Sequence, residues 1–254
     1  MTRALVTGGG ARLGRAMALY LGQRGYDVAV HYASSKDGAE DTATRIGGHS
    51  LALQADLLDE TQVQALLPAA AKALGGPITC LINNASIFEH DSVGTATRTS
   101  WDRHIESNLR APFVLTQAMA AQGLQTGSDG EPIAAGLIVN MLDQRVHKLT
   151  PDFASYTIAK MGLWAMTQTM AQALAPAIRV NGIGPGPTLQ GANQTAAQFA
   201  KQRGATILER GAHPKDITAA LGYFLDSPAV TGQMLAIDGG QHLAWQTPDV
   251  MGTE

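Results

Sequence analysis

The chain has 254 residues, of which 45% are hydrophobic and 15% charged, a composition typical of a folded globular protein rather than a disordered one. Its net charge of −3 gives no electrostatic reason to expect nucleic acid or an anionic membrane as a partner. The single cysteine, Cys80, excludes an internal disulfide, and its apolar neighbours predict a buried core thiol.

Short apolar runs alternate with helical patterns along the whole chain. The runs predict seven strands, at residues 4–6, 28–30, 51–53, 81–82, 137–139, 178–181 and 234–237. Helices are predicted at residues 13–24, 37–46, 59–74, 100–123, 153–174 and 214–225. Asp59, with Gln62 three residues later, predicts an N-cap and capping box for the third of these helices.

Strands that are apolar throughout, separated by helices, indicate an α/β fold with both faces of a parallel sheet covered. We therefore predict a single domain over residues 1–254, a doubly wound (Rossmann) seven-stranded parallel sheet with helices on both faces. The segment from Gly123 to Pro132 is expected to be a surface loop. The sequence shows no charged leader and no run long enough to span a bilayer, so a cytoplasmic protein is expected.

A glycine-rich turn, Thr7-Gly8-Gly9-Gly10-Ala11-Arg12-Leu13-Gly14, follows the first predicted strand. Glycines let the backbone approach a pyrophosphate closely, and the following helix presents free amides and the positive end of its dipole. Such a turn alone could equally be an ordinary strand–helix connection. Its place at the start of a series of alternating strands and helices favours a dinucleotide site.

The second predicted strand ends in His31-Tyr32-Ala33-Ser34-Ser35-Lys36, with no carboxylate before Asp37. A carboxylate here would bind the adenosine ribose hydroxyls and repel a 2′-phosphate. Two hydroxyls and a lysine suit a phosphate instead. The sequence therefore predicts NADP(H) rather than NAD(H) as cofactor.

Tyr156 and Lys160 lie four residues apart, and this spacing places them on one face of a predicted helix. A neighbouring ammonium stabilises a phenolate, so Lys160 is expected to lower the pKa of Tyr156 and make its hydroxyl a better proton donor. The YxxxK pattern is common by chance. It indicates a catalytic pair only because of its position in the order of predicted strands and helices.

Several motifs in the right order resemble the short-chain dehydrogenase/reductase family. They are the TGxxxGxG-like turn, Asn83-Asn84-Ala85-Ser86 in place of NNAG, Tyr156-Thr157-Ile158-Ala159-Lys160, and Asn181-Gly182-Ile183-Gly184-Pro185-Gly186. The resemblance implies that Tyr156 is the proton donor, that Lys160 holds the nicotinamide ribose, and that Asn108 supports a proton-relay water. It also implies cofactor contacts from Thr7, Gly8, Arg12, Leu13, Gly14, Tyr32, Ser34, Ser35, Asp56, Leu57, Asn84, Ala85, Lys160, Pro185, Gly186 and Thr188. The site is expected to contain no metal.

Three departures from the family pattern resemble one branch, the pteridine reductases and related bacterial dihydromonapterin and dihydrofolate reductases. Arg12 replaces the middle glycine, Ser86-Ile87-Phe88 follows Ala85, and Asp143 stands thirteen residues before Tyr156, where the family has a serine. Arg12 could pair with a phosphate or donate to a pterin carbonyl, and Ser86 could bind the ring edge. Phe88 could stack on the ring, while Asp143 and Tyr156 deliver protons to ring nitrogens.

The sequence thus predicts an NADPH-dependent reductase of a pterin-type C=N bond. A carbonyl or 3-oxoacyl reductase on the same scaffold and a non-catalytic NADP(H)-binding regulator remain as alternatives. The segment from Leu189 to Gly204 is rich in Gln, Ala, Asn and Thr, and residues 188–204 are expected to form a substrate lid. The family resemblance also implies a homotetramer.

Overall fold

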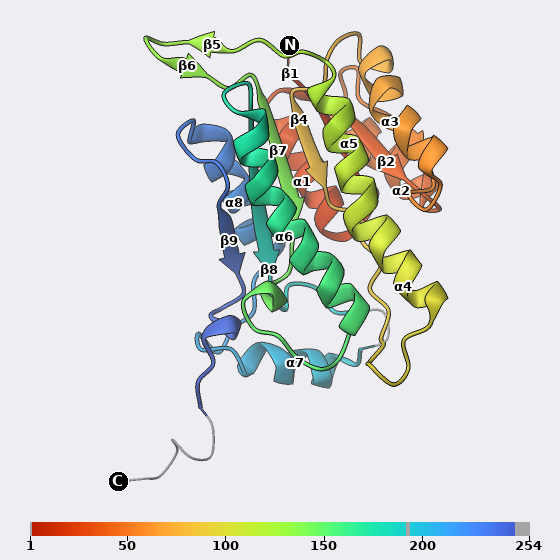
Figure 1. The fold of residues 1–254 in the computed structure, drawn as a ribbon, viewed down its shortest axis with the longest axis vertical. Helices are drawn as coiled ribbons and strands as arrows, with labels where there is room; N and C mark the ends of the chain where they lie inside the picture. The colour runs from red at the N-terminus through yellow and green to blue at the C-terminus, as the bar shows by residue number, and fades with distance from the viewer. Residues whose placement is uncertain (1, 192–193, 247–254) are drawn as a thin grey trace.

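A seven-stranded parallel sheet forms the centre of the computed structural model, which describes residues 2–191 and 194–246. Its strand order is β3-β2-β1-β4-β7-β8-β9, which confirms the predicted doubly wound topology (Figure 1). The strands are β1 (Thr2–Val6), β2 (Tyr26–Tyr32), β3 (Leu51–Gln54), β4 (Cys80–Asn83), β7 (Gly136–Met141), β8 (Ile178–Pro185) and β9 (Met234–Ile237). The ends of the predicted domain, residue 1 and residues 247–254, lie outside the described residues.

Helices cover both faces of the sheet. One apolar layer packs against α1 (Arg12–Gln23), α2 (Lys36–Ile46) and α8 (Pro214–Asp226). The other packs against α3 (Glu60–Ala73), α5 (Ala111–Ala120) and α6 (Ala154–Leu174). In β1, Ala4 and Val6 face the first layer and Leu5 faces the second, all fully buried. Coverage on both faces explains why β1 carries apolar residues at consecutive positions from Ala4 to Val6.

The predicted continuous helix over residues 100–123 is wrong. The structure has α4 (Arg98–Ile105), a π-helical turn (Glu106–Arg110) and α5 in its place. The π-turn contains Asn108, whose side chain is bound to another loop, and such bulges are frequent at functional sites. Hydrophobic periodicity does not reveal a one-residue change in helical winding.

Two further segments differ from expectation. The predicted surface loop from Gly123 to Pro132 carries most of a small hairpin, β5 (Gly127–Ser128) and β6 (Pro132–Ile133). The predicted lid contains α7 (Ala196–Gly204), capped by Thr195 and Gln198, while its residues 192–193 lie outside the described residues. In Figure 1, α7 lies at the end of the molecule toward which the parallel strands point.

The predicted cap of α3 is confirmed in part. The Asp59 carboxylate accepts hydrogen bonds from the backbone N–H groups of Thr61 and Gln62, at 2.9 and 3.3 Å. The Gln62 Oε1 accepts from the N–H of Asp56 rather than that of Asp59, so the cap fixes the turn after β3. Among the described residues, no helix is long and apolar enough to cross a membrane.

Candidate functional site

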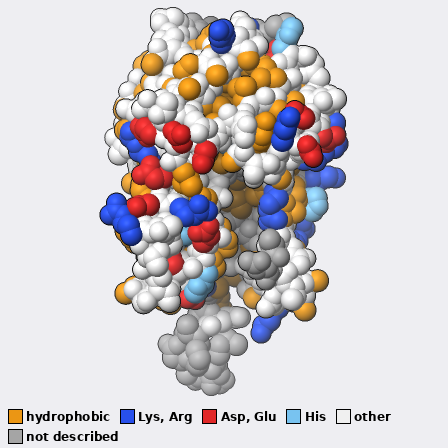
Figure 2. Space-filling view, turned by 90° about the vertical axis from the view of Figure 1, so that its right-hand side faces the viewer, with side chains coloured by type: hydrophobic (Ala, Val, Ile, Leu, Met, Phe, Trp, Pro, Cys, Tyr) orange, Lys and Arg blue, Asp and Glu red, His pale blue; other side chains and the backbone are white. Residues whose placement is uncertain are grey.

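Most of the predicted site residues outside the helices lie at or just after the carboxyl ends of β3, β2, β1, β4, β7 and β8, which are successive neighbours in the sheet. Because these strands are parallel, their carboxyl ends meet at one edge, which is where ligands bind in open α/β sheets. Figure 2 shows a hollow in the lower half of the surface, the half toward which the strands point in Figure 1.

Thr7 joins the glycine turn to the end of β4. Its Oγ1 accepts hydrogen bonds from the N–H groups of Asn84 and Ala85, both at 2.9 Å, and donates to the carbonyl of Ile82. The Asn84 amide in turn donates to the carbonyls of Thr7 and Gly8, at 2.8 and 3.3 Å. The structure therefore brings four predicted cofactor-binding residues into one hydrogen-bonded unit.

The glycine turn is packed closely against the start of α1, at Gly14. A Cβ at Gly14 would lie 2.1 Å from the carbonyl oxygen of Gly8, so only glycine fits there. Within the described chain, Ala11 begins α1 without a side-chain cap, which leaves amides of the first turn, at Leu13 and its neighbours, for a ligand. This arrangement fits a dinucleotide pyrophosphate.

Arg12 adopts a left-handed backbone with φ of 50°, at the position where the family pattern has glycine. This conformation costs a non-glycine residue about 1–3 kcal/mol. Its guanidinium donates to the carbonyls of Gln190 and Leu189, at 2.8 and 3.2 Å. Arg12 thus ties the glycine turn to the first residues of the lid, while its predicted contact with a phosphate or substrate carbonyl stays a prediction.

The end of β2 presents polar, exposed groups. Ser34, Ser35 and Lys36 are exposed after the half-buried Tyr32. Ser35 stands at the N-cap of α2, and within the described part of the chain its hydroxyl makes no cap bond. A free hydroxyl beside an uncapped helix N-terminus is well suited to a phosphate.

Asp56 and Leu57 follow β3 on the same side. The Asp56 carboxylate accepts from the Leu58 N–H at 2.9 Å and is exposed, whereas Leu57 is buried. His31, which sequence reasoning did not single out, links this turn to the glycine loop. Its Nδ1 accepts from the Gly8 N–H at 3.1 Å, so its Nε2 carries the hydrogen and donates to the Ala55 carbonyl at 3.0 Å.

Pro185 and Gly186 end β8 and begin the approach to the lid. A Cβ at Gly186 would lie 2.6 Å from Asp238, which explains the need for glycine. Thr188 is buried, and its Oγ1 donates to the carbonyl of Gly186 at 3.0 Å. The turn is therefore compact, with Thr188 held close to the carboxyl end of β8.

The hydroxyl of Tyr156 donates to the Asp143 carboxylate at 2.9 Å, which places two of the predicted catalytic residues in direct contact. The other carboxylate oxygen accepts from the Arg145 N–H at 2.8 Å. Both oxygens of Asp143 are therefore oriented, one toward the backbone and one toward the phenol.

Lys160 is buried beside Tyr156. Its Nζ donates to the Met141 carbonyl at 2.7 Å and lies 5.6 Å from the centre of the Tyr156 ring. Burial lowers the pKa of Lys160 to about 8, although the charge of Asp143 opposes that shift.

The pKa of Tyr156 is not lowered in this arrangement, and a lowering effect of Lys160 stays a prediction. Burial, together with the charge and hydrogen bond of Asp143, raises the pKa of Tyr156 well above its ordinary value. A hydrogen bond from Ser86 and the charge of Arg145 only partly oppose this. Burial likewise raises the pKa of Asp143, against the hydrogen bonds from Arg145 and Tyr156.

Asn108 holds the loop after β4 instead of pointing freely into the site. Its amide nitrogen donates to the Ile87 carbonyl and its amide oxygen accepts from the Ile87 N–H, both at 2.8 Å. Ile87 is flanked by Ser86 and Phe88, which are two of the predicted substrate contacts. A part for Asn108 in supporting a water stays a prediction.

Phe88 is 55% exposed and lies beside Tyr156, with an edge contact of 4.8 Å between ring centres. It also stacks on Phe153, with ring centres 4.3 Å apart and planes within 7°. The Arg145 guanidinium lies over Phe153, 4.8 Å from its centre. Sequence reasoning missed Phe153 and Arg145 because no motif marks them, although their positions next to Asp143 and Tyr156 were a usable signal.

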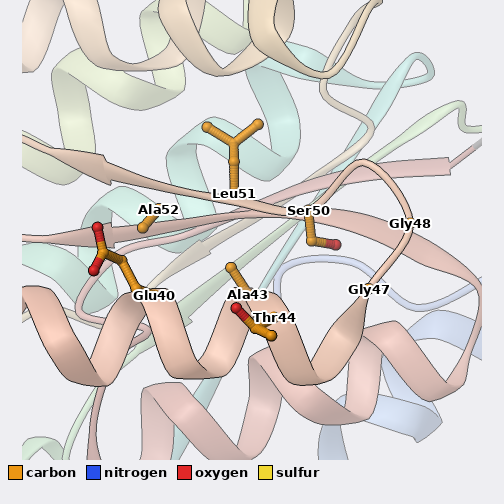
Figure 3. A pocket seen from close by; sticks show the side chains of 8 residues that line it. All are labelled: Glu40, Ala43, Thr44, Gly47, Gly48, Ser50, Leu51 and Ala52. Atoms are coloured by element: carbon orange, nitrogen blue, oxygen red, sulfur yellow. The ribbon is translucent and has the colours of Figure 1, made fainter.

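A separate open depression of about 480 Å³ lies between α2 and β3 (Figure 3). It is lined by Glu40, Ala43, Thr44, Gly47, Gly48, Ser50, Leu51 and Ala52, and contains none of the predicted site residues. Within the described ranges, no group of three or more His, Cys, Asp or Glu residues could hold a metal ion.

Comparison with known proteins gives two kinds of relative. A family model described as enoyl-(acyl carrier protein) reductase matches residues 10–242. The 3-oxoacyl-[acyl-carrier-protein] reductase of Staphylococcus aureus is 30% identical over 248 residues, covering 94% of this chain and 98% of that protein. The FolM alternative dihydrofolate reductase 1 from Brucella suis, solved in complex with NADP, is 42% identical with a TM-score of 0.90, covering 98% of both chains.

Proposed function

Because the chain belongs to the short-chain dehydrogenase/reductase family, we propose that it is an NADPH-dependent reductase of a C=N bond in a pterin-type substrate. The observation that carries this proposal is the contact between Asp143 and Tyr156, 2.9 Å long, at the position where the family pattern has a serine. The likeness to a dihydrofolate reductase crystallised with NADP supports both the cofactor and the substrate class.

The residues present fit NADP(H). The glycine turn and the start of α1 would hold the pyrophosphate, and Ser34, Ser35 and Lys36 would hold the 2′-phosphate. Lys160 and Thr188 would hold the nicotinamide end. When bound, the reduced cofactor supplies a hydride to the substrate carbon.

The substrate nitrogen must gain a proton as its neighbouring carbon gains the hydride. Tyr156 is a neutral phenol, since its pKa is raised by burial and by Asp143, and it can donate that proton. A phenolate beside an ionised Asp143 would be costly, so a protonated Asp143 passes its proton to Tyr156 in the same step. The raised pKa of Asp143 makes that protonated form accessible.

The aromatic pair Phe88–Phe153 suits a flat ring system. Phe88 is half-exposed beside the Tyr156 hydroxyl, so a heteroaromatic ring can contact it while presenting a nitrogen to Tyr156. Ser86 lies in the same loop and can bind the ring edge. Residues 188–204, held at their start by Arg12, are proposed to close over the substrate.

A 3-oxoacyl or other carbonyl reductase is the second candidate, favoured by the relatives of that activity. A ketone oxygen needs a donor, which a serine supplies at any pH and an aspartate supplies only when protonated. A panel of 7,8-dihydropterins, dihydrofolate and 3-oxoacyl thioesters, followed by NADPH oxidation, separates the two. No turnover with any of them would favour a non-catalytic NADP(H)-binding protein.

We also propose a cytoplasmic homotetramer. Apolar side chains are exposed on neighbouring helices, Trp101 on α4 and Ile158 and Met161 on α6, at 39, 48 and 37%. Such a face is suited to a symmetric contact with a second copy. Light scattering after size-exclusion chromatography tests this, and a monomer at micromolar concentration would contradict it.

A further inference from the structure

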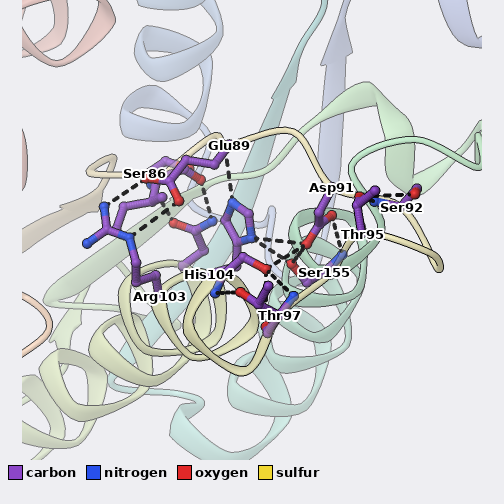
Figure 4. A network of polar contacts seen from close by, with 12 residues as sticks. Ser86, Glu89, Asp91, Ser92, Thr95, Thr97, Arg103, His104 and Ser155 are labelled. Atoms are coloured by element: carbon purple, nitrogen blue, oxygen red, sulfur yellow. Dashed lines mark hydrogen bonds and ion pairs between the residues drawn. The ribbon is translucent and has the colours of Figure 1, made fainter.

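Three buried polar side chains, those of Asp91, Ser155 and His104, form a hydrogen-bonded network (Figure 4). The exposed fractions of these residues are 1% for Asp91 and 0% for His104 and Ser155. The Ser155 hydroxyl donates to the Asp91 carboxylate, and the Ser155 N–H donates to its other oxygen at 3.2 Å. His104 Nδ1 lies 2.6 Å from the Ser155 hydroxyl oxygen. None of these residues belongs to the site predicted from the sequence.

The direction of each hydrogen bond follows from one backbone amide. The Glu89 N–H donates to His104 Nε2 at 3.1 Å, so Nε2 must be the unprotonated nitrogen. Nδ1 then carries the hydrogen and donates to Ser155, whose own hydrogen goes to Asp91. The neutral imidazole is supported by burial, which lowers the pKa of His104.

The network holds the backbone beside both aromatic rings of the proposed substrate wall. At one end it holds the amide of Glu89, the residue next to Phe88. At the other end, the Asp91 carbonyl accepts from the Phe153 N–H at 2.7 Å. Phe153 has a left-handed backbone, with φ of 58°, which costs about 1–3 kcal/mol and persists only when surrounding contacts fix it.

The same hydrogen-bonded network also contacts the proposed proton donor, Tyr156. Ser155 directly precedes Tyr156 at the start of α6, and the His104 ring lies 6.0 Å from the Tyr156 ring in an edge contact. One buried unit therefore fixes the relative positions of Phe88, Phe153 and the Tyr156 backbone.

We propose that Asp91, His104 and Ser155 are positioning residues that hold Phe88 and Phe153 as a preformed aromatic wall beside Tyr156. A rigid wall lowers the ordering cost of binding a flat ring, so the network sets substrate affinity more than cofactor affinity. This inference rests on the proposed function only in taking the substrate to be a heteroaromatic ring.

Protonation of His104 at acid pH should weaken the contacts that hold Phe88 and Phe153 in place. Protonation of His104 places a hydrogen on Nε2 opposite the Glu89 N–H, and that bond is lost. The Asp91 carboxylate, 4.0 Å from His104 Nδ1, favours the protonated imidazolium. The Glu89 carboxylate, which is paired with Arg103, favours it as well. The charge of Arg103 opposes protonation of His104, and the neutral Tyr156 does not favour it. The substrate KM should therefore rise at acid pH, below the ordinary range of histidine titration.

The test compares Ser155→Ala with Thr157→Val. Thr157 lies on the same helix and is also buried, but within the described residues its hydroxyl has no hydrogen-bond partner, so it is a matched control. We expect Ser155→Ala to raise the dihydropterin KM about tenfold or more, with the NADPH Kd unchanged within about twofold. Thr157→Val should change neither.

His104→Gln is the second variant, because its amide can both accept from Glu89 and donate to Ser155 yet does not titrate. It should keep a near-normal KM at neutral pH and remove the rise in KM at acid pH. Equal KM values for Ser155→Ala and Thr157→Val, or equal losses for dihydropterin and NADPH, would overturn the inference.

Amide hydrogen exchange of Glu89 and Phe153 in the free protein gives a readout that needs no substrate. Both amides should be protected in wild type and Thr157→Val, and exchange faster in Ser155→Ala. Equal protection in all three would also overturn the inference. Absence of dihydropterin turnover in wild type, with the exchange result as expected, would overturn the proposed function and leave the positioning network standing.

Discussion

Replacement of Asp143 by asparagine tests the proposed proton path directly. Asparagine keeps the size of the side chain and can still accept from the Arg145 N–H, the contact that is 2.8 Å long in the structure. Its amide cannot pass a proton to Tyr156. Because general acid catalysis contributes about 10²- to 10⁴-fold, we expect dihydropterin kcat/KM to fall by about 100-fold or more.

The same substitution should not weaken the fold. The pKa of Asp143 is raised by burial, so the folded state binds its proton more tightly than the unfolded state does. Its contribution to stability is therefore present at low pH and is lost as the pH rises through the raised pKa. At neutral pH the buried carboxylate is a cost, and Asp143→Asn should have a Tm equal to or above that of wild type.

The pH profile supplies the assay. Wild-type turnover of dihydropterin, measured by NADPH oxidation, should fall as the pH rises through the pKa of Asp143. The residual turnover of Asp143→Asn should not show this dependence on pH. Asp143→Ser should behave in the same way with dihydropterin while improving any ketone turnover. Near-normal dihydropterin turnover in Asp143→Asn, or a lower activity that simply follows a lower Tm, would refute the reasoning.

Four further outcomes are expected. NADPH should bind more tightly than NADH, because exposed Ser35 and its neighbours, with no carboxylate at the end of β2, suit a 2′-phosphate; fluorescence titration giving equal affinities would contradict this. Tyr156→Phe should keep NADPH binding and lower kcat by about two or more orders of magnitude, and near-normal kcat would place the proton donor elsewhere. Phe88→Ala should weaken dihydropterin binding at least several-fold, since an aromatic contact contributes about 0.5–1.5 kcal/mol beyond its area, and calorimetry showing an equal loss for NADPH would make Phe88 only structural. Burial lowers the pKa of His31, so the unfolding free energy should fall as the pH drops below about 6.5, because the unfolded state then binds more protons; denaturant titrations should show a smaller fall in His31→Gln.

The fold could be predicted because its determinants are local. The inner strands of the sheet are short, largely buried and mostly apolar runs, and the turns of the site that follow β1 and β8 are marked by glycine. The break at Asn108 could not be predicted, because the π-turn coincides with a contact to Ile87, 21 residues away. Helix α7 lies in a polar segment whose composition gives little periodicity.

The site was predicted as a set of residues but not as a set of contacts. The pairing of Asp143 with Tyr156 follows from their motif, yet its effect on the Tyr156 pKa depends on burial and on distances that sequence spacing does not give. Arg12 was expected to face a ligand, and its partners are backbone carbonyls 177 and 178 residues away. Asp91 and Ser155, 64 residues apart, carry no sequence signal of their contact.

The most direct test of the account is the specificity of the wild-type enzyme. With NADPH saturating, kcat/KM is measured for a 7,8-dihydropterin and for a 3-oxoacyl thioester under the same conditions. We predict a clear preference for the dihydropterin, by about tenfold or more, since the Asp143–Tyr156 pair and the Phe88–Phe153 wall serve a ring nitrogen rather than a ketone. Turnover of the thioester with no detectable dihydropterin reduction would contradict it.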